Sequence, residues 1–325
     1  MNFCTHFDSN YLPHALSLAN SLSRNLRNFN LFLMCMDDIS FKYLESNRPK
    51  NTTLIHFREM ENYFKDLKAA KKNRNRIEYF FTCTPAVCNY IIKRNKGIDF
   101  LTYLDSDLYF FSSPQVIFDE IGEKSISIIE HRFNWITSRQ RKFGIYNVGW
   151  ITFKNDSDGK KCLDDWMKNC IKWCYQKVEK KRFADQKYLD DWPNVYENVC
   201  VIKNIGANVA TWNISNYKIS EREGEIFVED KKLVFYHFAN LIQTGQKSFK
   251  TNLSRVFVKL KGVLKQNIYL PYLLELDRNN VLSKKIMPKK DNHFKKRSAD
   301  MVITFSRKLR DFCYDDTIHL GDYEN

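Results

Sequence analysis

The stretch that decides the fold of this chain is FLTYLDSDLYFF, residues 100–111. An apolar run of this length is typical of a strand that is buried on both faces in the middle of a parallel sheet. Two carboxylates, Asp105 and Asp107, interrupt the run, and a buried carboxylate is costly unless it is paired, hydrogen-bonded or bound to a cation. We therefore expect the strand to break at these residues, at the sheet edge where open α/β folds bind their ligands.

The spacing of the two aspartates predicts a shared site. Side chains two residues apart on an extended chain point the same way, so Asp105 and Asp107 could face one ligand. Two hard oxygen ligands beside an open position suit Mg²⁺ or Mn²⁺, with phosphate oxygens completing the coordination shell. The alternative is a turn with two solvated aspartates, because Asp-x-Asp is a common tripeptide.

The composition indicates a folded and basic chain. A sequence of 325 residues, 43% of them hydrophobic, is long enough for one large domain or one domain with an appendage. It contains no apolar run that predicts a transmembrane helix and no signal-peptide pattern. The nine scattered cysteines favour reduced structural thiols in a cytosolic chain over a zinc site or a disulfide framework. The formal net charge of +14 predicts an acidic partner, such as nucleic acid, anionic lipid or nucleotide phosphates.

Predicted strands and helices alternate along the chain, as they do in a doubly wound α/β sheet. Strands are expected over residues 3–7, 31–36, 53–57, 100–111, 126–129, 143–153, 199–202, 226–228 and 233–236. Helices are expected over residues 11–26, 60–96 and 163–177, with Pro85 starting a new helix inside the second range.

Polar side chains recur where the predicted strands end. Glu130 and His237 each follow an apolar strand, as the two aspartates do, so His237 could meet the same metal ion. Arg76 precedes an apolar segment that could aim an arginine at a diphosphate. Each feature also has a structural interpretation, because a lone histidine is usually structural and a basic run such as 71–76 is usually a solvated helix face.

Three other segments carry candidate binding residues. Asp8 lies at the first strand–helix crossover, where it could line a nucleotide pocket or cap the helix. Asn147 lies between two glycines and offers both a donor and an acceptor, although the segment could equally be a strand with a bulge. Asp185 could line the site or merely cap a short helix near Tyr188.

The chain lacks the glycine-rich and zinc-binding motifs of several large enzyme classes. No Gly-x-x-x-x-Gly-Lys-Ser/Thr, Gly-x-Gly-x-x-Gly or His-Glu-x-x-His pattern occurs. This argues against P-loop ATPases, dinucleotide oxidoreductases and zinc peptidases. A fold that binds phosphates without a glycine loop needs a metal ion, which returns attention to Asp105 and Asp107.

Taken in order, these pieces resemble the GT-A glycosyltransferases, and within them the family 8-like nucleotide-sugar transferases. The resemblance covers roughly residues 1–245. It is carried by the segments Cys4-Thr5-His6-Phe7-Asp8, Arg76 with Phe81-Thr82-Cys83-Thr84-Pro85, Tyr103-Leu104-Asp105-Ser106-Asp107-Leu108, Tyr146-Asn147-Val148-Gly149, Ala184-Asp185-Gln186 and Tyr236-His237-Phe238.

The resemblance implies an α/β fold of the GT-A type, a Rossmann-like mixed central sheet flanked by helices, over residues 1–245. A basic, mainly helical C-terminal extension would follow over residues 246–325. The metal ligands would be Asp105, Asp107 and His237, holding Mn²⁺ or Mg²⁺ against the diphosphate of a nucleotide-sugar.

The resemblance also assigns roles to the other nominated residues. Those that would contact the nucleotide, its phosphates or the donor sugar are Thr5, Phe7, Asp8, Arg76, Ser106, Asn147 and Lys247. Asp185 would hold sugar hydroxyls and Gln186 would lie close to the anomeric carbon. An inverting enzyme would need a base near the acceptor hydroxyl, for which Asp185 and Glu130 are the candidates. The chain departs from the family after His237, where 239–242 replaces the usual Gly-x-x-Lys-Pro-Trp-like segment.

The function implied is that of a metal-dependent hexosyltransferase. It would move a sugar from a nucleotide-sugar, with UDP favoured, to a glycan or lipid-linked acceptor in surface polysaccharide or lipopolysaccharide assembly. Nucleic acid is not an expected partner. Two alternatives remain: a nucleotidyltransferase that makes nucleotide-sugars, and a basic module that binds nucleic acid or lipid without catalysis.

The C-terminal portion carries two amphipathic stretches separated by a basic linker. The first runs over 256–268, before Pro271 is expected to interrupt it, and the second over 301–312. These stretches predict either helices that pack on the core or an interfacial anchor to anionic lipid. The expected location is the cytoplasm, with peripheral contact to the inner membrane face if the anchor exists.

Overall fold

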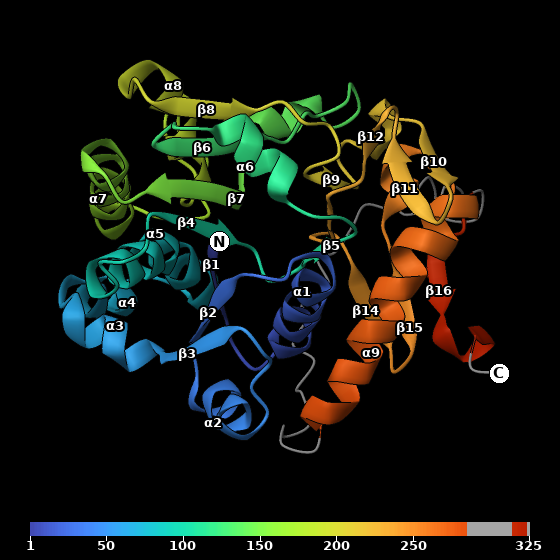
Figure 1. Ribbon diagram of the computed structural model, residues 1–325, viewed down its shortest axis with the longest axis horizontal. Helices are drawn as coiled ribbons and strands as arrows, with labels where there is room; N and C mark the ends of the chain where they lie inside the picture. Colours follow the sequence, from blue (N-terminus) through green and yellow to red (C-terminus); the bar gives the residue numbers. More distant parts are fainter. Residues whose placement is uncertain (285–313, 324–325) are drawn as a thin grey trace, which may run out of the picture.

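The computed structural model describes residues 1–284 and 314–323, and its centre is a seven-stranded mixed sheet (Figure 1). The strand order is β3-β2-β1-β4-β7-β6-β8, and β7 runs antiparallel to both of its neighbours while the other pairs are parallel. The strands are β1 (Asn2–Phe7), β2 (Asn30–Cys35), β3 (Thr52–His56), β4 (Phe100–Leu104), β6 (Ile126–Glu130), β7 (Tyr146–Lys154) and β8 (Val199–Ile202).

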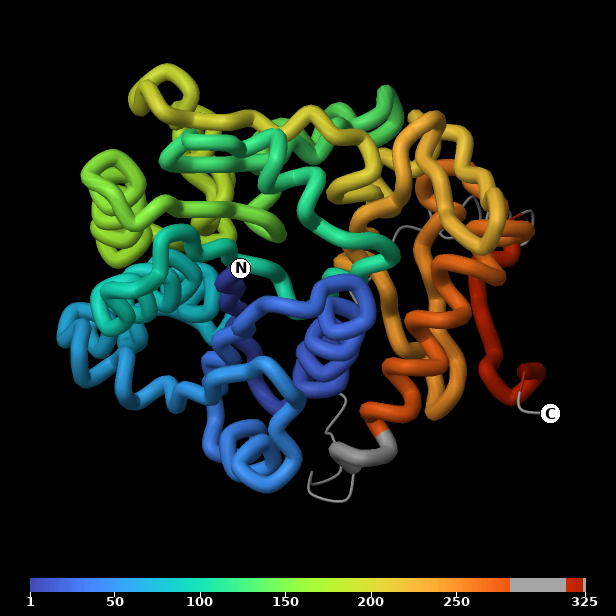
Figure 2. The backbone as a smooth tube through the Cα atoms, in the orientation of Figure 1, coloured from blue at the N-terminus to red at the C-terminus, as the bar shows by residue number. Residues whose placement is uncertain are grey.

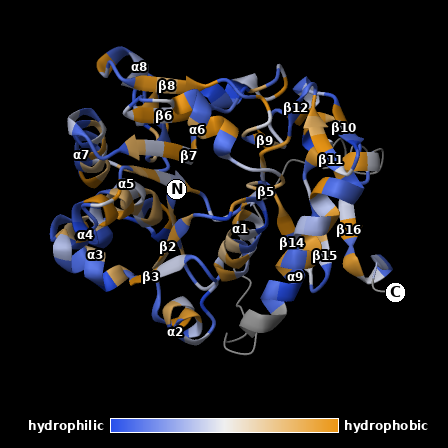
Figure 3. Cartoon of the chain, viewed as in Figure 1, coloured by the Kyte–Doolittle hydropathy of each residue, from blue (hydrophilic) through white to orange (hydrophobic). Residues whose placement is uncertain are grey.

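Helices cover both faces of this sheet. One face packs against α3, α4, α5 and α7, and the other against α1, α2 and α6, so each face has its own hydrophobic cluster. Trp150 and Ile151, neighbours on β7, are fully buried in different clusters because successive strand side chains point to opposite faces. Figure 3 accordingly shows hydrophobic colours along β6, β7 and β8. The helices are α1 (Leu12–Asn25), α2 (Asp38–Ser46), α3 (Phe57–Tyr63), α4 (Asp66–Lys72), α5 (Arg76–Arg94), α6 (Gln115–Ile121), α7 (Ser157–Lys172), α8 (Trp192–Val195) and α9 (Leu270–Lys284).

The expected strand over 100–111 is two strands in two different sheets. β4 ends at Leu104, and β5 (Leu108–Phe110) belongs to a second sheet of order β5-β13-β9, with β9 (Val209–Ala210) and β13 (Phe235–His237). The break falls at Asp105-Ser106-Asp107, as the two carboxylates predict. β13 pairs antiparallel with β5 and sets His237 opposite Leu108, one residue from Asp107.

The prediction that Pro85 starts a helix is wrong. Pro85 lies buried inside α5, which begins at Arg76 behind a capping box formed by Asn75 and Glu78. A proline inside a helix loses one backbone hydrogen bond and costs about 3 kcal/mol in an isolated helix. Packing overrides this preference, because residues on both sides of Pro85 lie in the core. The broad helical range 60–96 is therefore three helices, α3, α4 and α5.

The C-terminal residues build a third hydrophobic cluster. Val256, Leu260, Leu264 and Ile268 are buried in it, so this first amphipathic stretch packs on the core. The cluster also contains residues from before 245, such as Tyr236, and α9 packs along α1 (Figures 1 and 2). The expected second stretch, 301–312, and most of the basic linker lie outside the described residues.

The expectation that Pro271 interrupts the helix is also wrong. The chain runs as a π-helical segment, η5 (Leu264–Tyr269), directly into α9, and Pro271 is the second residue of α9. A wider π turn accommodates a proline that has no backbone N–H to donate. Within the described part of the chain, no helix combines the length and apolar character that crossing a bilayer requires.

The remaining elements are short. The small sheets are formed by β10 (Ile219–Arg222), β11 (Glu225–Val228) and β12 (Lys231–Lys232), and by β14 (Ile242–Gly245), β15 (Ser248–Lys250) and β16 (Thr317–His319). The short 3₁₀ segments are η1 (Ser138–Phe143), η2 (Gln186–Asp191), η3 (Ile214–Asn216), η4 (Leu253–Val256) and η6 (Leu320–Tyr323).

Candidate active site

A cavity of about 620 Å³ lies at the carboxyl ends of β1 and β4, where the first sheet gives way to the second. This is the edge at which open α/β folds bind ligands. Among the nominated residues, the cavity is lined by Phe7, Asp8, Arg76, Asp105, Ser106, Asp107, Asn147, Asp185, Gln186 and His237.

Three nominated residues do not line this cavity. Thr5 is buried in β1, and its Oγ1 has no hydrogen-bond partner. Glu130 ends β6 with its carboxylate 3.6 Å from Lys203 Nζ, and Lys247 lies in the β14–β15 hairpin, where its carbonyl accepts from the Leu320 N–H. Thr5 shares its face of β1 with Phe7, but it lies two residues further from the end of the strand at which the cavity opens.

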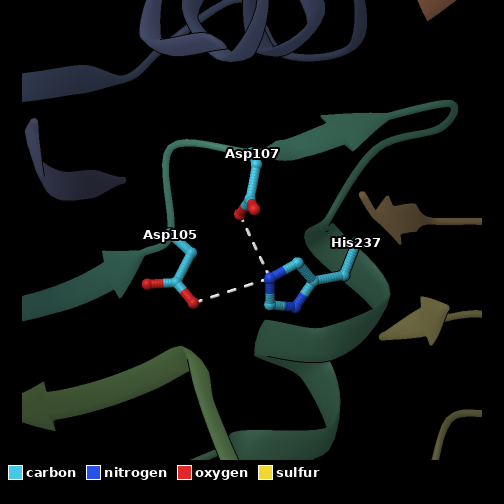
Figure 4. Close-up of side chains that lie close together, drawn as sticks. All are labelled: Asp105, Asp107 and His237. Carbon is cyan, nitrogen blue, oxygen red and sulfur yellow. Dashed lines mark ion pairs between the residues drawn. The ribbon is translucent and has the colours of Figure 1, made fainter. Parts of the chain in front are cut away.

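Asp105, Asp107 and His237 converge at the edge of the cavity (Figure 4). His237 Nε2 lies 3.1 Å from Asp107 Oδ1 and 3.6 Å from Asp105 Oδ2. One ligand atom from each residue lies within 4.8 Å of the others, a spacing that suits a single bound cation. Two carboxylates and an imidazole are donors that Mn²⁺ and Mg²⁺ accept, so the side chains fit the metal that the fold implies.

The electrostatics of the group are those of a site for positive charge. Burial, reinforced by Asp107, raises the pKa of Asp105 to about 6. For Asp107, burial would raise the pKa, but the neighbouring His237 outweighs it and the pKa is lowered. For His237, burial would lower the pKa, but Asp107 and Asp105 outweigh it and the pKa is raised. The Tyr103 hydroxyl also donates to Asp105 Oδ1 at 3.0 Å.

The His237 ring is held from behind by β7. Asn147 Oδ1 lies 3.2 Å from His237 Nδ1 and accepts from the Gly149 N–H at 3.0 Å. A Cβ on Gly149 would lie 2.5 Å from Asn147 Oδ1 and 2.8 Å from His237 Cε1, so only glycine fits there. Glycine is needed here because two side chains lie close to its Cα, and not because its φ is positive. The bulge expected in this strand is present, because the pairing register of β6 and β7 shifts between Ile128 and Ile129.

The β1–α1 crossover forms another part of the cavity wall. Asp8 Oδ1 accepts from the backbone N–H groups of Asn10 and Tyr11 at 2.8 and 3.3 Å, and Oδ2 contacts Arg76. Asp8 thus organises the turn before α1 but does not cap it, since the N-cap position is Tyr11. Arg76 lines the cavity with its side chain 60% exposed. Arg74, by contrast, is buried, with its guanidinium 3.9 Å from the centre of the Tyr175 ring.

Asp185 and Gln186 line another part of the cavity wall. Burial is the main cause that raises the pKa of Asp185 to about 7, and Asp105 adds to it. The Asp185 carbonyl accepts from the buried Trp166 indole at 2.9 Å, and Gln186 Nε2 donates to the Phe143 carbonyl at 3.1 Å. Asp185 occupies the N-cap position of η2, as the sequence allowed, but its side chain makes no capping hydrogen bond there.

Several cavity residues escape prediction from the sequence. Tyr11, 49% exposed at the start of α1, presents a ring to the cavity beside Asp8. The other missed residues are mainly aromatic and come from different parts of the chain: His131 and Phe133 after β6, Phe143 at the end of η1, and Phe183 and Trp212 in later loops. Only Tyr11 could have been found from the sequence, as an aromatic residue directly after Asp8-Ser9-Asn10. The other residues come together only in the folded chain.

Comparison with known proteins places the chain in a family. It is 30% identical over 281 residues to the uncharacterized protein YfnD of Bacillus subtilis (strain 168), covering 85% of this chain and 89% of YfnD. The chain belongs to the same family as YfnD. The uncharacterized protein YfnF of the same organism is 29% identical over 297 residues, covering 87% of this chain and 97% of YfnF. No family model matches the sequence.

Solved structures identify the fold of this YfnD relative. The galactosyltransferase LgtC, in complex with donor and acceptor sugar analogs, superposes with a TM-score of 0.50 at 13% identity, covering 90% of this chain and 98% of LgtC. An active-site mutant of LgtC gives a TM-score of 0.51 with the same coverage. The chain therefore has the GT-A glycosyltransferase fold that its sequence resembles. Its central sheet, flanking helices and Asp-x-Asp turn all agree with that expectation.

Proposed function

We propose that this protein is a metal-dependent glycosyltransferase that uses a nucleoside diphosphate sugar, with UDP favoured, as its donor. One observation carries the proposal: Asp105, Asp107 and His237 converge beside a cavity at the ligand-binding edge of a GT-A fold. No specific observation favours either alternative, the nucleotidyltransferase or the basic binding module. A basic binding module also needs no buried carboxylates around a histidine.

The metal ion would be held by carboxylate oxygens of Asp105 and Asp107 and by Nε2 of His237. When bound, a divalent cation there neutralises the negative charge that develops on the departing diphosphate. Arg76 adds a second positive charge at the cavity wall, beside Asp8. His237 and Asp107 are largely buried, which strengthens charge interactions at the metal group relative to bulk solvent, whereas Arg76 is 60% exposed and acts more weakly.

In the proposed reaction, the bond between the anomeric carbon and the β-phosphate oxygen breaks and its electron pair stays on the phosphate. An acceptor hydroxyl forms the new glycosidic bond and loses its proton. Asp185, whose pKa of about 7 leaves a partly ionised carboxylate near neutral pH, would accept a hydrogen bond from a sugar hydroxyl or take that proton. Gln186 lies next to it at the same end of the cavity.

The nucleoside would occupy the β1–α1 side of the cavity. Tyr11 offers an exposed aromatic face for a base, and Phe7 and Asp8 line the adjoining wall. Base stacking on an aromatic ring contributes about 1–3 kcal/mol and tolerates different bases. The preference for UDP therefore rests on the family resemblance and not on these contacts.

The acceptor is proposed to be a glycan or a lipid-linked glycan in surface polysaccharide or lipopolysaccharide assembly. The eight cysteines of the described residues are free thiols, seven of them buried, which supports a reducing, cytoplasmic setting. Contact with the inner membrane face remains part of the proposal only for the stretch over 301–312.

Thermal unfolding tests the proposal. Wild type and Asp107→Ala are melted with UDP-, GDP- and CMP-sugars, each with and without Mn²⁺. A ligand at about 100 times its dissociation constant stabilises by about 2.7 kcal/mol, so one nucleotide should raise the Tm of wild type only when Mn²⁺ is present. The variant should show no rise. A panel in which no nucleotide-sugar raises the Tm of wild type would overturn the proposal.

A further inference from the structure

Hydrogen bonds within the protein use nearly all of the hydrogen-bonding capacity of the Asn147 side chain. Its Oδ1 is shared by the Gly149 N–H and His237 Nδ1, and its Nδ2 lies 3.2 Å from His131 Nε2. An amide oxygen accepts two hydrogen bonds, so Asn147 has no acceptor left and only one N–H free for a ligand. This leaves it poorly suited to hold sugar hydroxyls, the role that the family resemblance implies.

The Gly149 N–H determines the orientation of the Asn147 side-chain amide. A backbone N–H can only donate, so the atom that faces it must be the oxygen of Asn147. The other amide atom, Nδ2, therefore faces His131, and the amide orientation needs no further assumption.

Both imidazole tautomers follow from this one bond. Oδ1 of Asn147 can only accept, so His237 must carry a proton on Nδ1. When His237 is neutral, its Nε2 then presents a lone pair toward Asp105 and Asp107. Nδ2 of Asn147 can only donate, so His131 Nε2 must be unprotonated. His131 accordingly carries its proton on Nδ1, 3.0 Å from the Ile145 carbonyl that accepts it.

Packing holds the two rings in this arrangement. Trp212 contacts both edge-to-face, with centroid distances of 5.2 Å to His131 and 5.1 Å to His237. Phe133 stacks on His131 at 4.5 Å and 10°. Burial also lowers the pKa of His131 to about 3, consistent with a neutral ring that can accept from Asn147.

We propose that Asn147 and His131 are positioning residues for the metal ligand His237. A continuous chain of donors and acceptors runs from the Ile145 carbonyl through His131 and Asn147 to His237, and it presents His237 Nε2 as a ligand. The inference rests on the proposed function only in requiring that a metal ion binds at Asp105, Asp107 and His237. Second-sphere partners of metal-bound histidines change metal affinity by about 10- to 100-fold.

The test measures Mn²⁺ affinity directly, without nucleotide or turnover, from the electron paramagnetic resonance signal of free Mn²⁺. Asn147→Leu, which removes both hydrogen-bonding groups, should weaken binding by about 10- to 100-fold. His131→Phe keeps a ring between Phe133 and Trp212 but removes the acceptor, and should weaken binding by about 10-fold. His131→Gln restores an acceptor oxygen near the position of Nε2 and should recover affinity to within about 3-fold of wild type.

A matched control separates positioning from general destabilisation. Asn134 is another buried asparagine nearby, and it bonds to Thr137 and Ser215 but not to the metal group. Asn134→Leu should lower the Tm while leaving Mn²⁺ affinity unchanged. The Tm of every variant is measured alongside its affinity.

Two results would overturn the inference while leaving the proposed function intact. One is Asn147→Leu binding Mn²⁺ as tightly as wild type in a folded protein. The other is His131→Gln being as weak as His131→Phe, which would show that the acceptor at Nε2 is not what matters. Failure of wild type to bind Mn²⁺, even with UDP present, would instead overturn the metal site and the proposed function with it.

Discussion

The two ends of the cavity are built in different ways. The metal end is polar: Asp105, Asp107 and His237 come from strand termini of two sheets, and hydrogen bonds hold their side chains from behind. The other end, around Asp185 and Gln186, is largely aromatic: Phe80 and Phe81 come from α5, Phe143 from η1 and Phe183 from a loop, and packing holds them.

This difference predicts separate roles for the two ends: the metal end would serve catalysis, and the aromatic end would select the sugar. The metal end can neutralise a diphosphate, which every nucleoside diphosphate sugar carries, and strand termini give it fixed geometry. The aromatic end surrounds Asp185 and Gln186, where the transferred sugar would lie, and loops can vary there without disturbing the sheet. Substitutions at the metal end should therefore remove binding and activity, and those at the other end should change which sugar is used.

The largest effect is expected for Asp107→Ala. Loss of one of two carboxylate ligands should lower Mn²⁺ affinity by more than about 100-fold and activity by a larger factor, because partner residues of metal ligands alone are worth about 10- to 100-fold. The comparison variant is Phe183→Ala, at the aromatic end, which should leave Mn²⁺ affinity unchanged and alter the KM for the donor. Calorimetric titration of both proteins with Mn²⁺ measures this. Equal losses of Mn²⁺ affinity in the two variants would show that the ends do not act separately.

The next effect is expected for Gly149→Ala. The added Cβ would overlap the Asn147 amide and the His237 ring, both buried, so the ring must leave its position beside the carboxylates. We expect an overpacking cost of about 1–3 kcal/mol and a loss of Mn²⁺ affinity of about 10-fold. Denaturant unfolding and metal titration measure the two quantities.

Gly97→Ala is the matched control for that substitution. No atom lies within 4 Å of a Cβ at Gly97, and its φ is not positive, so both quantities should stay within error of wild type. If Gly149→Ala behaved in the same way, the close packing behind His237 would not be needed for the metal site.

Asp185→Asn should lower activity and, in metal-free protein, raise stability. The pKa of Asp185 is about 7 in the folded state against 3.8 in the unfolded chain, so folding favours the protonated form. That favourable contribution is complete below pH 4 and is lost as pH rises toward 7, by about 4 kcal/mol at most. Asparagine cannot ionise, so the variant should gain stability relative to wild type between pH 4 and 7 and keep that gain above pH 8.

Urea unfolding of both proteins in EDTA across this pH range measures the gain, and donor turnover should fall in the same variant. A difference in unfolding free energy that does not change between pH 4 and 8 would contradict the raised pKa of Asp185.

The smallest effect is expected for Arg76→Ala. Its side chain is largely exposed and pairs with Asp8 at the cavity wall, so its loss should raise the KM for the donor by about 10-fold and change the Tm little. Arg74→Ala should do the reverse, because Arg74 is buried against Tyr175 and also donates to the Ile171 carbonyl. Steady-state kinetics and thermal melts of the two variants measure the donor KM and the Tm. If both variants changed the same one of these quantities, the two arginines would not have separate roles.

The sequence predicted the metal end better than the aromatic end. Asp105, Asp107 and His237 interrupt or follow apolar runs, so strand prediction alone brings them to one edge of a sheet. The aromatic end depends on loops, such as the one containing Phe183, whose positions no periodicity encodes. Tertiary packing also overrode local preference at Pro85 and Pro271, which lie inside helices although each was expected to bound one.

Hydrogen-bond partners across the chain were equally beyond prediction. Nothing in the sequence pairs Asn147 with both His131 and His237, because the contacts depend on how β6, β7 and β13 meet. Glu130 shows the reverse error, since it ends a strand as the metal ligands do but does not line the cavity. A residue's place at a strand end predicts the edge of the sheet at which it lies, and not the direction of its side chain.

Phosphorus NMR of a donor incubated with wild type and Mn²⁺, recorded after the paramagnetic Mn²⁺ has been removed on a chelating resin, would test most directly which bond this protein breaks. The donor is the nucleotide-sugar that stabilises the protein most in the melts. Glycosyl transfer, to water or to an added acceptor, should release the nucleoside diphosphate with its two coupled phosphorus signals intact, and Asp107→Ala should release none. Formation of nucleoside monophosphate with sugar 1-phosphate, or of nucleoside triphosphate and sugar 1-phosphate when pyrophosphate is added, would contradict glycosyl transfer.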